Sequence, residues 1–404
     1  MPRELPPFVR RFGQRLAFVV LSLAAALPAQ ADESAVASQT EREQASWAAS
    51  LSVVGQRLNA PATASGKSEG RLSYRGDLSG QWAAGAWLGA EWSLAGHMRF
   101  GRGAGVVQTD RLYTGAVNSL AFPTGDGYPA WFAILAEAYA NLSWPVAVAG
   151  AGSQIDVTVG KLDPFVFFDQ NAVAADESRQ FLNNVFVHNP LLDSGKDVAV
   201  DDCGFAPGLR LAYRSAIDRV WSWSGSVGVF ASGNAARLHG DVKAPLGMAQ
   251  LELTEAENGA DRAVGGYRLY VWTNGQTMDA LAQRPQRHAG VGVSVDRRVS
   301  PSWVLFGRWG KRTAGTGAFD QGTTVGGELD GRYWSREQDV LGLALGFLNG
   351  SGSMGQEQLA EMYYRLHPHE GVEISPDIQL IRNPGGQKNG GLVKAVGLRV
   401  TLSY

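Results

Sequence analysis

Short segments of alternating apolar and polar residues run along most of the chain, and this pattern limits the fold more than any other feature. In the last segment, Val396, Leu398 and Val400 fall on one face of an extended chain, whereas Gly397 and Arg399 fall on the other. Successive side chains in a strand point to opposite faces. Each such segment is therefore predicted to form a β-strand with one apolar and one polar face.

Sixteen segments of this kind can be counted, and turns rich in Gly, Asp, Asn and Pro separate them. The 51 glycines, 12 tryptophans and 11 tyrosines suit strands and turns better than helices. An apolar stretch, residues 130–152, is long enough for a membrane helix, but Glu137, Asn141 and Pro145 interrupt it, so we prefer two strands joined by a turn. The segments begin near Leu51, Leu72, Trp82, Ile134, Ile155, Gly208, Trp221, Met248, Gly266, Ala289, Trp303, Thr323, Leu341, Leu359, Val372 and Val393.

The start of the chain has the three parts of a secretory signal. Arginines precede an apolar run at residues 16–27, and Ala29-Gln30-Ala31 forms a small-x-small cleavage site. The run is shorter than the about 20 residues that a membrane-spanning helix needs. We therefore expect residues 1–31 to be a signal peptide, 32–46 a polar N-terminal segment, and 47–404 a single exported domain.

The alternating pattern fits both a soluble β-sandwich and a transmembrane barrel. The export signal, the strand number, the absence of disulfides and the aromatic residues near segment ends, such as Trp144 and Tyr404, together favour the barrel. In hydrocarbon every backbone N–H and C=O must be paired, so the sheet must close on itself. We expect an all-β protein: a transmembrane antiparallel β-barrel of about sixteen strands, with both termini on the periplasmic side.

Four longer connections remain to be assigned to the outside of this barrel or to its interior. A barrel of about sixteen strands encloses a water-filled lumen unless a loop narrows it, so we expect in-folded loops that form a constriction. The connections are residues 101–131, 163–204, 232–246 and 274–287.

Several other classes of function are disfavoured. The formal net charge is −2 and no basic patch is present, so we expect no nucleic-acid partner. Cys203 is the single cysteine, and the six histidines show no metal-binding spacing. We therefore predict no enzyme activity, no metal site and no cofactor. The acids from Asp197 to Asp202 would suit calcium, but a solvated acidic loop is the simpler interpretation.

Residues 350–355 form a GxGxxG sequence directly after an apolar strand, the pattern of a dinucleotide-binding turn. Such a fold needs a helix next, yet Ala360, Met362 and Tyr364 alternate with polar residues in the manner of another strand. We therefore interpret the glycines as a hairpin loop.

The stretch 160–184 is too polar and too aromatic for a simple connection. It mixes Asp163, Asp169 and Asn171 with several phenylalanines. Carboxylates and amides exchange hydrogen bonds with sugar hydroxyls, and aromatic rings cover the apolar C–H face of a sugar. A packed surface loop is the alternative on chemistry alone.

Four pieces of the chain resemble the carbohydrate-selective porin family (OprB type), in the order and spacing of that family. They are GKLD at 160–163 with FDQNAVAADESRQFLNN at 168–184, GYRLYVW at 266–272, EMYYR at 361–365 followed by SPDIQ at 375–379, and NPGG at 383–386 before VGLR at 396–399. The N-terminal third is less diagnostic. Tyr404 stands where phenylalanine is more usual, and it keeps an aromatic residue at the end of the chain.

The resemblance implies an outer-membrane porin of a Gram-negative bacterium, exported through the periplasm. It implies passive, facilitated diffusion of glucose and similar sugars past in-folded loops and charged residues. The expected partners are carbohydrate solutes, outer-membrane lipid and the barrel assembly machinery, which would act on the C-terminal strand. Because trimers are common among such pores, a homotrimer is one expected assembly.

The pleat direction and the long motif together select candidates for the residues that line the constriction. Arginines and carboxylates that face each other across a water-filled neck would offer a sugar both donors and acceptors. Some of these residues must instead tie a loop to the wall. The candidates are Asp163, Asp169, Asn171, Asp176, Arg268, Tyr270, Glu361, Tyr363, Arg365, Asp377, Gln379 and Arg399.

Two other interpretations stay open. One keeps the channel but changes the solute to small organic acids, and an arginine-rich neck would favour it. The other is a non-conducting structural barrel, although the chain has few N-terminal residues from which to build a plug.

Overall fold

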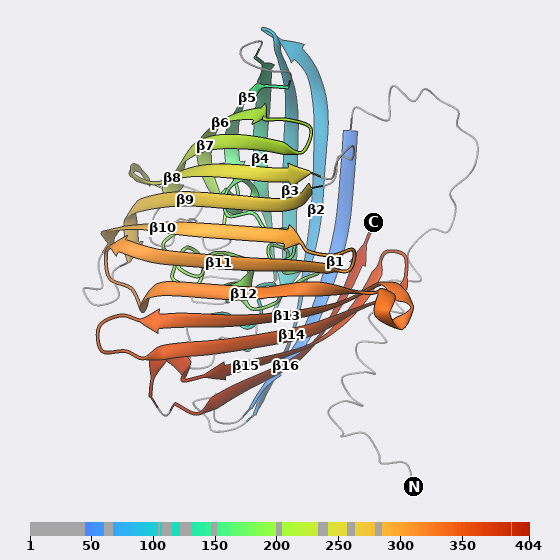
Figure 1. Ribbon diagram of the computed structural model, residues 1–404, viewed down its shortest axis with the longest axis vertical. Coiled ribbons are helices and arrows are strands. Elements are labelled where there is room, and N and C mark those ends of the chain that lie inside the picture. Colours follow the sequence, from blue (N-terminus) through green and yellow to red (C-terminus); the bar gives the residue numbers. More distant parts are fainter. Residues whose placement is uncertain are drawn as a thin grey trace. The chain divides into compact units, whose positions relative to one another are not determined.

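The described residues of the computed structural model form sixteen antiparallel strands in a closed barrel (Figure 1). The structure describes residues 45–59, 68–103, 106, 115–121, 131–146, 152–198, 204–232, 241–256, 263–278, 285–388 and 390–404. The strands are β1 (Ala45–Leu58), β2 (Glu69–Trp87), β3 (Ala90–Arg102), β4 (Trp131–Pro145), β5 (Gln154–Leu162), β6 (Ala206–Ala216), β7 (Trp221–Ser232), β8 (Asp241–Ala256), β9 (Ala263–Met278), β10 (Pro285–Arg298), β11 (Trp303–Ala314), β12 (Phe319–Gly331), β13 (Arg336–Gly350), β14 (Gln356–His369), β15 (Val372–Arg382) and β16 (Leu392–Ser403).

Helical structure in the described ranges is limited to single turns. Two of them, α3 (Pro164–Phe167) and α4 (Asn184–Val187), lie in the connection between β5 and β6, and the 3-10 turns are η3 (Arg332–Trp334) and η4 (Pro384–Gly386). None of these helices is long and apolar enough to cross a membrane. Within the stretch that was long enough for a membrane helix, Trp131–Pro145 forms β4.

The predicted antiparallel barrel of about sixteen strands is confirmed, and one boundary differs from the sequence-based one. The first strand begins at Ala45, two residues before the expected start of the domain, because Ala45 and Ser46 pair with Trp82 and Gln81 of β2. The GxGxxG residues form the hairpin between β13 and β14, as interpreted above. The predicted signal peptide lies outside the described residues.

The barrel closes between its first and last strands. β1 pairs with β16 along its length, from Ser50 opposite Ser403 to Leu58 opposite Ala395. The hydroxyls of Ser52 and Thr401 lie 3.0 Å apart on the inner side of this seam. Each residue of the pair Ala49 and Tyr404 donates its backbone N–H to the carbonyl of the other, at 3.0 and 2.9 Å. No edge of the sheet is left unpaired there, as a lipid environment requires.

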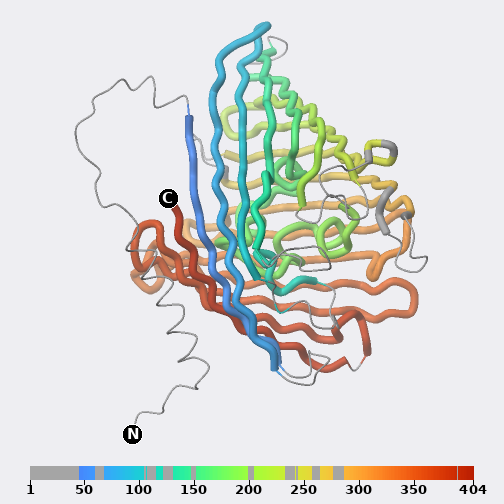
Figure 2. Tube along the Cα trace, turned by 180° about the vertical axis from the view of Figure 1, so that it is seen from behind, coloured from blue at the N-terminus to red at the C-terminus, as the bar shows by residue number. Residues whose placement is uncertain are grey.

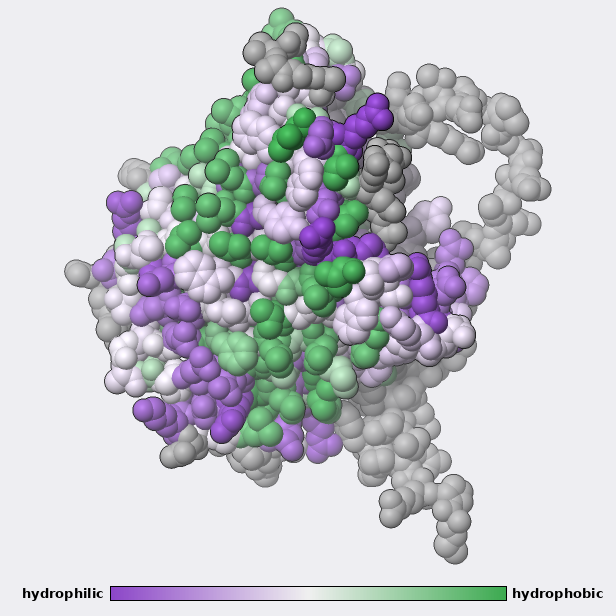
Figure 3. Space-filling model, viewed as in Figure 1, coloured by the Kyte–Doolittle hydropathy of each residue, from purple (hydrophilic) through white to green (hydrophobic). Residues whose placement is uncertain are grey.

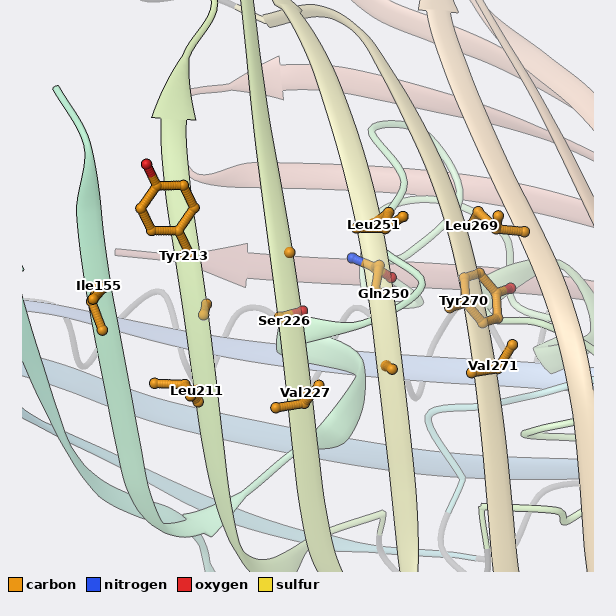
Figure 4. A pocket seen from close by; sticks show the side chains of 13 residues that line it. Ile155, Leu211, Tyr213, Ser226, Val227, Gln250, Leu251, Leu269, Tyr270 and Val271 are labelled. Carbon is orange, nitrogen blue, oxygen red and sulfur yellow. The ribbon is translucent and has the colours of Figure 1, made fainter. Parts of the chain in front are cut away.

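The outward faces of the strands are apolar. Leu251 and Val271 are 60% and 50% exposed, whereas their chain neighbours Gln250 and Tyr270 are 5% and 1% exposed on the inner side. Hydrophobic side chains accordingly cover much of the barrel face in Figure 3. Between β5 and β9 this face has a shallow apolar hollow beside the small residue Gly225 (Figure 4).

Several exposed tryptophans lie at the barrel end where β1 begins and β16 ends. Trp47 lies near the start of β1, Trp82 near the end of β2, Trp223 near the start of β7, and Trp303 begins β11. Amphipathic rings of this kind lie at the level of lipid headgroups. Such a belt is the position expected for one membrane interface.

Glycines on the inner face make room for large aromatic rings on the neighbouring strand. Gly290 and Gly292 of β10 lie opposite Trp272 and Tyr270 of β9. A Cβ added to Gly290 would lie 2.1 Å from the Trp272 ring, and one added to Gly292 would lie 2.3 Å from the Tyr270 ring. Only glycine lets these rings lie flat against the wall.

Two connections enter the barrel. One is the described part of the β5–β6 connection, residues 163–198, which we call the inner loop; the other is the segment 115–121 between β3 and β4. Figure 2 shows the green chain of the inner loop within the ring of strands. Inner-loop residues such as Phe168, Phe181 and Phe186 share one hydrophobic core with inward-facing residues of the wall, including Phe230 and Trp272.

Candidate functional site

The inner loop turns into the barrel directly after β5. The Asp163 carboxylate caps the α3 turn by accepting the backbone N–H of Phe165 at 2.8 Å, and Pro164 occupies the first helical position. Proline has no N–H to lose at that position, and an N-cap carboxylate satisfies an orphan donor. The sequence Asp-Pro therefore ends the strand and redirects the chain.

The first attachment of the inner loop to the wall is at Asp169. One carboxylate oxygen accepts hydrogen bonds from the Tyr270 hydroxyl at 2.7 Å and from Arg308 Nε at 3.0 Å. The other accepts the backbone N–H of Asn189 at 2.5 Å. Asp169 has a φ of 58°, a left-handed conformation that aspartate tolerates better than most residues. A buried charge needs such partners, and here they come from two strands and from the loop itself.

The second attachment is at Asp197, at the far end of the inner loop. Its carboxylate lies 2.8 Å from Arg312 Nη2 and 2.9 Å from His288 Nδ1, and it accepts the indole N–H of Trp272 at 3.0 Å. The Asp197 side chain has no exposed surface. This corrects the expectation of a solvated acidic loop at Asp197, because Arg312 compensates the charge of the carboxylate inside the barrel and the Trp272 and His288 side chains surround it. Asp201, Asp202 and Cys203 lie outside the described residues.

The third attachment is made by β14 and β15. Glu361 accepts the backbone N–H groups of Leu182 and Asn183 at 2.5 and 3.0 Å. Gln379 accepts a hydrogen bond from the Asn183 side chain at 3.1 Å and donates to the carbonyl of Val117 at 2.8 Å. Both in-folded segments are therefore held by one pair of strands.

The fourth attachment uses Arg399 of β16. Its guanidinium donates to the carbonyls of Glu177, Arg179 and Gln180 at 2.7 to 2.8 Å. Arg365 of β14 adds a hydrogen bond to the carbonyl of Arg179 at 2.9 Å. The fixed fork of donors on arginine suits a turn of chain that presents several carbonyls at once.

These attachments divide the interior into a filled sector and an open one. The inner faces of β9 to β16 are covered: Tyr270, Tyr363 and Arg399 are each 1% exposed. On β2 and β3, by contrast, the inward side chains of Asp77, His97 and Arg99 keep 15% or 16% of their surface exposed. A cavity beside β1 to β4 is lined by Gln81, His97, Glu137 and Tyr139, among other residues. The cavity and these partly exposed side chains lie beside β1 to β4, and on β6 the inward-facing Arg210 is also only partly buried. We call the part of the interior beside β2 to β6 the open sector.

A network of charges crosses this open sector. Asp77 lies 2.8 Å from Arg75 Nε, 2.7 Å from Arg99 Nε and 2.8 Å from His97 Nε2. The other ring nitrogen of His97 lies 3.2 Å from Glu137 on β4. The network links three neighbouring strands and presents donors and acceptors side by side.

The network also reaches the inner loop. Arg75 Nη1 lies 2.6 Å from the Glu177 carboxylate. Burial alone would raise the pKa of Glu177, but the charge and hydrogen bond of Arg75 outweigh it and lower the pKa to about 2. Glu177 therefore stays ionised across the physiological range, and the salt bridge fixes the loop beside β2.

Two further residues of the inner loop, Asp163 and His188, have pKa values above their ordinary ones. Burial, reinforced by the charge of Glu137, raises the pKa of Asp163 to about 6, although His188 opposes this. Burial would lower the pKa of His188, yet its hydrogen bond to Asp193, at 3.1 Å, and the nearby carboxylates raise it above its ordinary value. The His188 ring stacks on Phe165 with centroids 3.8 Å apart.

Most of the candidates from the sequence belong to the contacts between the inner loop and the wall. Asp169, Tyr270, Glu361, Gln379 and Arg399 make the attachments described above. Three further candidates bond within the wall or along the loop: Arg268 pairs with Glu252 at 2.7 Å and Asp296 at 2.6 Å, Asp377 accepts from Gln379 at 2.9 Å, and Asp176 accepts from the Ser178 N–H at 2.9 Å.

The four remaining candidates are Asn171, Tyr363, Arg365 and Asp163. Asn171 donates to the Ser294 hydroxyl and the Val295 carbonyl, both at 3.3 Å. Tyr363 donates to Glu328, which also lies 3.3 Å from Arg365. Asp163 alone among the twelve lies where the inner loop meets the network of β3 and β4, because its backbone N–H donates to Glu137 at 3.3 Å.

Sequence reasoning missed the charged network of the open sector. Asp77, His97 and Arg99 lie in the N-terminal third, where no family motif drew attention to them, and Glu137, in a piece 136–139 that also resembles the family, was not taken as a candidate. A signal was present: Arg75 with Asp77, and His97 with Arg99, are charged or polar pairs two residues apart in strands whose alternate positions carry apolar residues such as Leu78 and Phe100. Such pairs predict two side chains on the inner face.

A closed barrel with an apolar outer face, an inward loop after its fifth strand and a charged open sector defines an outer-membrane porin. The chain belongs to the carbohydrate-selective porin OprB family, whose model matches residues 21–404. It is thus a sugar channel of the Gram-negative outer membrane, and the sequence-based prediction of family, fold and function is confirmed.

Solved structures share the fold. A high-pH structure of Pseudomonas putida OprB is 16% identical with a TM-score of 0.69, over 91% of this chain and 96% of that chain. The outer-membrane channel DcaP of Acinetobacter baumannii is 12% identical with a TM-score of 0.51, over 89% and 97%. A search of curated protein sequences found no significant match.

Proposed function

We propose that sugars pass by facilitated diffusion along the open sector and meet their narrowest point between the inner loop and β2 to β4. The observation that carries this proposal is the covering of β9 to β16 by the inner loop, while Asp77, His97 and Arg99 keep exposed surface. A solute on this path meets hydroxyl-binding groups of both signs. No covalent step is involved.

In this proposal the candidate residues have two roles. Asp169, Tyr270, Glu361, Gln379 and Arg399 position the inner loop. Asp163 joins the constriction, together with the network around Asp77 and His97. Arginine and carboxylate groups that pair with each other in the resting pore can exchange partners with sugar hydroxyls at little cost.

Selectivity then rests on weak binding. An affinity of ~1 mM corresponds to about −4 kcal/mol, which permits rapid exit, whereas nanomolar binding would block the flow. The exchange of one set of hydrogen bonds for another satisfies this requirement, because the net gain from each bond is small.

The proposal includes the route and the partners of the chain. Residues 1–31 direct export to the periplasm, the C-terminal strand that ends before Tyr404 engages the barrel assembly machinery, and lipid covers the apolar outer face. The proposed assembly is a homotrimer. The molar mass of the detergent-extracted protein, determined by light scattering, tests that last point separately.

Conductance across a planar bilayer, with and without glucose, tests the channel. We expect an open pore whose current falls reversibly at millimolar glucose, and proteoliposomes that swell faster in glucose than in a larger disaccharide. If the current is unchanged by every sugar tested, the proposed selectivity is wrong. If the protein gives no conductance, the proposed pore is wrong.

A further inference from the structure

An arginine on the inner face of the open sector has no partner of opposite charge. Arg210 of β6 lies opposite Thr158 of β5, whose hydroxyl donates to the inward-facing Asn141 at 2.8 Å. The buried Nε of Arg210 makes no hydrogen bond, and within the described residues no carboxylate lies within 4.0 Å of its guanidinium. A buried charge or donor without a partner costs free energy, so such a group calls for an explanation.

Other inward-facing arginines are satisfied by the protein itself. Arg75, Arg99 and Arg308 each pair with a carboxylate, and Arg399 donates to three loop carbonyls. The carboxylate of Asp156, on the strand next to Arg210, is already paired with Arg214 Nε at 2.8 Å. Within the described residues Arg210 thus carries a positive charge on the wall of the open sector that no ion pair neutralises.

An aromatic ring lies beside this charge. The Arg210 guanidinium carbon is 5.0 Å from the centroid of the Phe167 ring, which the α3 turn of the inner loop supplies. On β4, the Tyr139 ring meets Phe167 edge-on, with centroids 5.8 Å apart. In the described part of the chain the Tyr139 hydroxyl makes no hydrogen bond, and Tyr139 also lines the cavity beside His97. Phe167 therefore lies between two polar groups with unused hydrogen-bonding capacity.

These three groups match a ligand that has both a ring and a single negative charge. Guanidinium binds a carboxylate through two parallel hydrogen bonds, an aromatic face covers the C–H face of a sugar, and a phenol hydroxyl serves sugar hydroxyls. A neutral sugar leaves the Arg210 charge uncompensated. A dianion would bring more charge than Arg210 can neutralise, in a part of the wall that already carries the acids Asp156 and Glu252.

We propose that Arg210, Phe167 and Tyr139 form a subsite for a monocarboxylate sugar, such as an aldonate or a uronate. The inference rests on the proposed function, since it assumes that sugars follow the open sector. It extends the range of solutes from neutral carbohydrates to their singly charged acids. The subsite binds the carboxylate at Arg210 and leaves the hydroxyls to Tyr139 and to the network around His97.

Current block in planar bilayers tests this subsite with glucose, glucuronate and the uncharged methyl ester of glucuronate. For the unaltered chain we expect half-block at a lower concentration of glucuronate than of the ester or of glucose. In Arg210→Gln the half-blocking concentration of glucuronate should rise about tenfold, the effect of losing a charge-assisted bidentate contact, while that of glucose should change less than about twofold.

Two further variants separate the subsite from a general effect of charge. Arg214→Gln also removes one positive charge from β6, but from an arginine whose partner is Asp156, so glucuronate block should stay within about twofold. Arg210→Lys keeps the charge and loses the planar fork, and it should give an intermediate value. Heat-modifiable migration in gels verifies that each variant is folded. If Arg210→Gln does not fold, the glucuronate block of Arg210→Lys is compared with that of the unaltered chain instead, and an unchanged half-blocking concentration would contradict the inference.

Equal losses in Arg214→Gln and Arg210→Gln, or equal block by glucuronate and its ester in the unaltered chain, would overturn the inference. If the unaltered pore responds to glucose yet shows no preference for the acid, the subsite is wrong and the proposed function stands. If it responds to none of these sugars, the proposed function itself fails.

Discussion

Arg308 and Asp169 form an ion pair from which solvent is excluded: Nε and Oδ1 are 3.0 Å apart, and neither side chain has exposed surface. The pair connects β11 to the inner loop. Arg308 also donates to the carbonyls of Asp169 and Phe186, at 3.0 and 2.7 Å. One side chain thus holds two points of the loop that are far apart along the chain.

Replacing Asp169 by Asn should therefore loosen the inner loop and widen the pore. Removal of one partner of a buried pair leaves the other charge uncompensated, at a cost of about 3–5 kcal/mol. We expect a higher and noisier single-channel conductance and a lower melting temperature in detergent. The matched control is Arg297→Gln, which breaks a pair with Glu255 at a half-exposed arginine and should cost at most about 1 kcal/mol. Unchanged conductance in Asp169→Asn would show that this contact does not set the width of the pore.

Glu361→Gln should increase the mobility of residues 182 and 183. The carboxylate of Glu361 accepts both backbone N–H groups, whereas an amide offers one oxygen and turns its donor toward the second N–H. Amide hydrogen exchange of a peptide that spans these residues should become at least about tenfold faster, as expected when charge-assisted hydrogen bonds are lost. Met362→Leu, on the outward face of the same strand, should leave exchange unchanged. Protection that persists in Glu361→Gln would mean that hydrophobic packing of the loop suffices.

Ion selectivity should depend on pH near 6. The pKa of Asp163 is raised to about 6, so this carboxyl is largely protonated at pH 5 and largely ionised at pH 7. The added negative charge at the constriction should raise the ratio of potassium to chloride permeability as pH increases. His188 acts in the same direction, because it loses its positive charge as pH rises above its raised pKa.

Reversal potentials in a salt gradient, recorded from pH 5 to pH 8, measure this change. Asp163→Asn should remove the step near pH 6 and keep the more gradual contribution of His188. The double variant Asp163→Asn with His188→Gln should be nearly flat over this range. A step that survives in the double variant would assign the titration to another group.

Gly292→Ala should destabilise the barrel. The added methyl group would lie 2.3 Å from the Tyr270 ring, which cannot retreat because its hydroxyl is bonded to Asp169 and Asn189. Overpacking of this kind costs about 1–3 kcal/mol. Gly307→Ala is the control, since its Cβ would have no neighbour closer than 3.9 Å. The temperature at which each variant loses its compact gel mobility provides the comparison.

The strands and their closure could be read from the sequence, whereas the partners of the inward side chains could not. A period of two assigns Tyr270, Glu361 and Arg399 to the inner face, and the structure confirms that face. The same period cannot distinguish a side chain that meets water from one that meets an in-folded loop. That distinction depends on contacts between residues more than a hundred positions apart, such as Arg308 with Asp169.

The burial of Asp197, in the inner loop, could not be predicted from the sequence either. In the sequence Asp197 belongs to an acidic stretch that looks solvated, because the residues that bury its carboxylate are distant along the chain. Its partners Arg312 and His288 come from β11 and β10. The family resemblance covered the inner loop and the later strands, and so the network around Asp77 and His97 emerged only from the structure.

The seam between β1 and β16 has a consequence for biogenesis. β1 comes first in the chain, but one of its edges can form hydrogen bonds only with β16, the last strand, where Ser50 pairs with Ser403. Until β1 and β16 pair, both edge strands expose unpaired N–H and C=O groups that can pair with other chains and cause aggregation. We therefore expect that the exported chain needs shielding until β16 has paired with β1, and that truncation before Leu392 leaves an open, protease-sensitive sheet instead of a smaller pore.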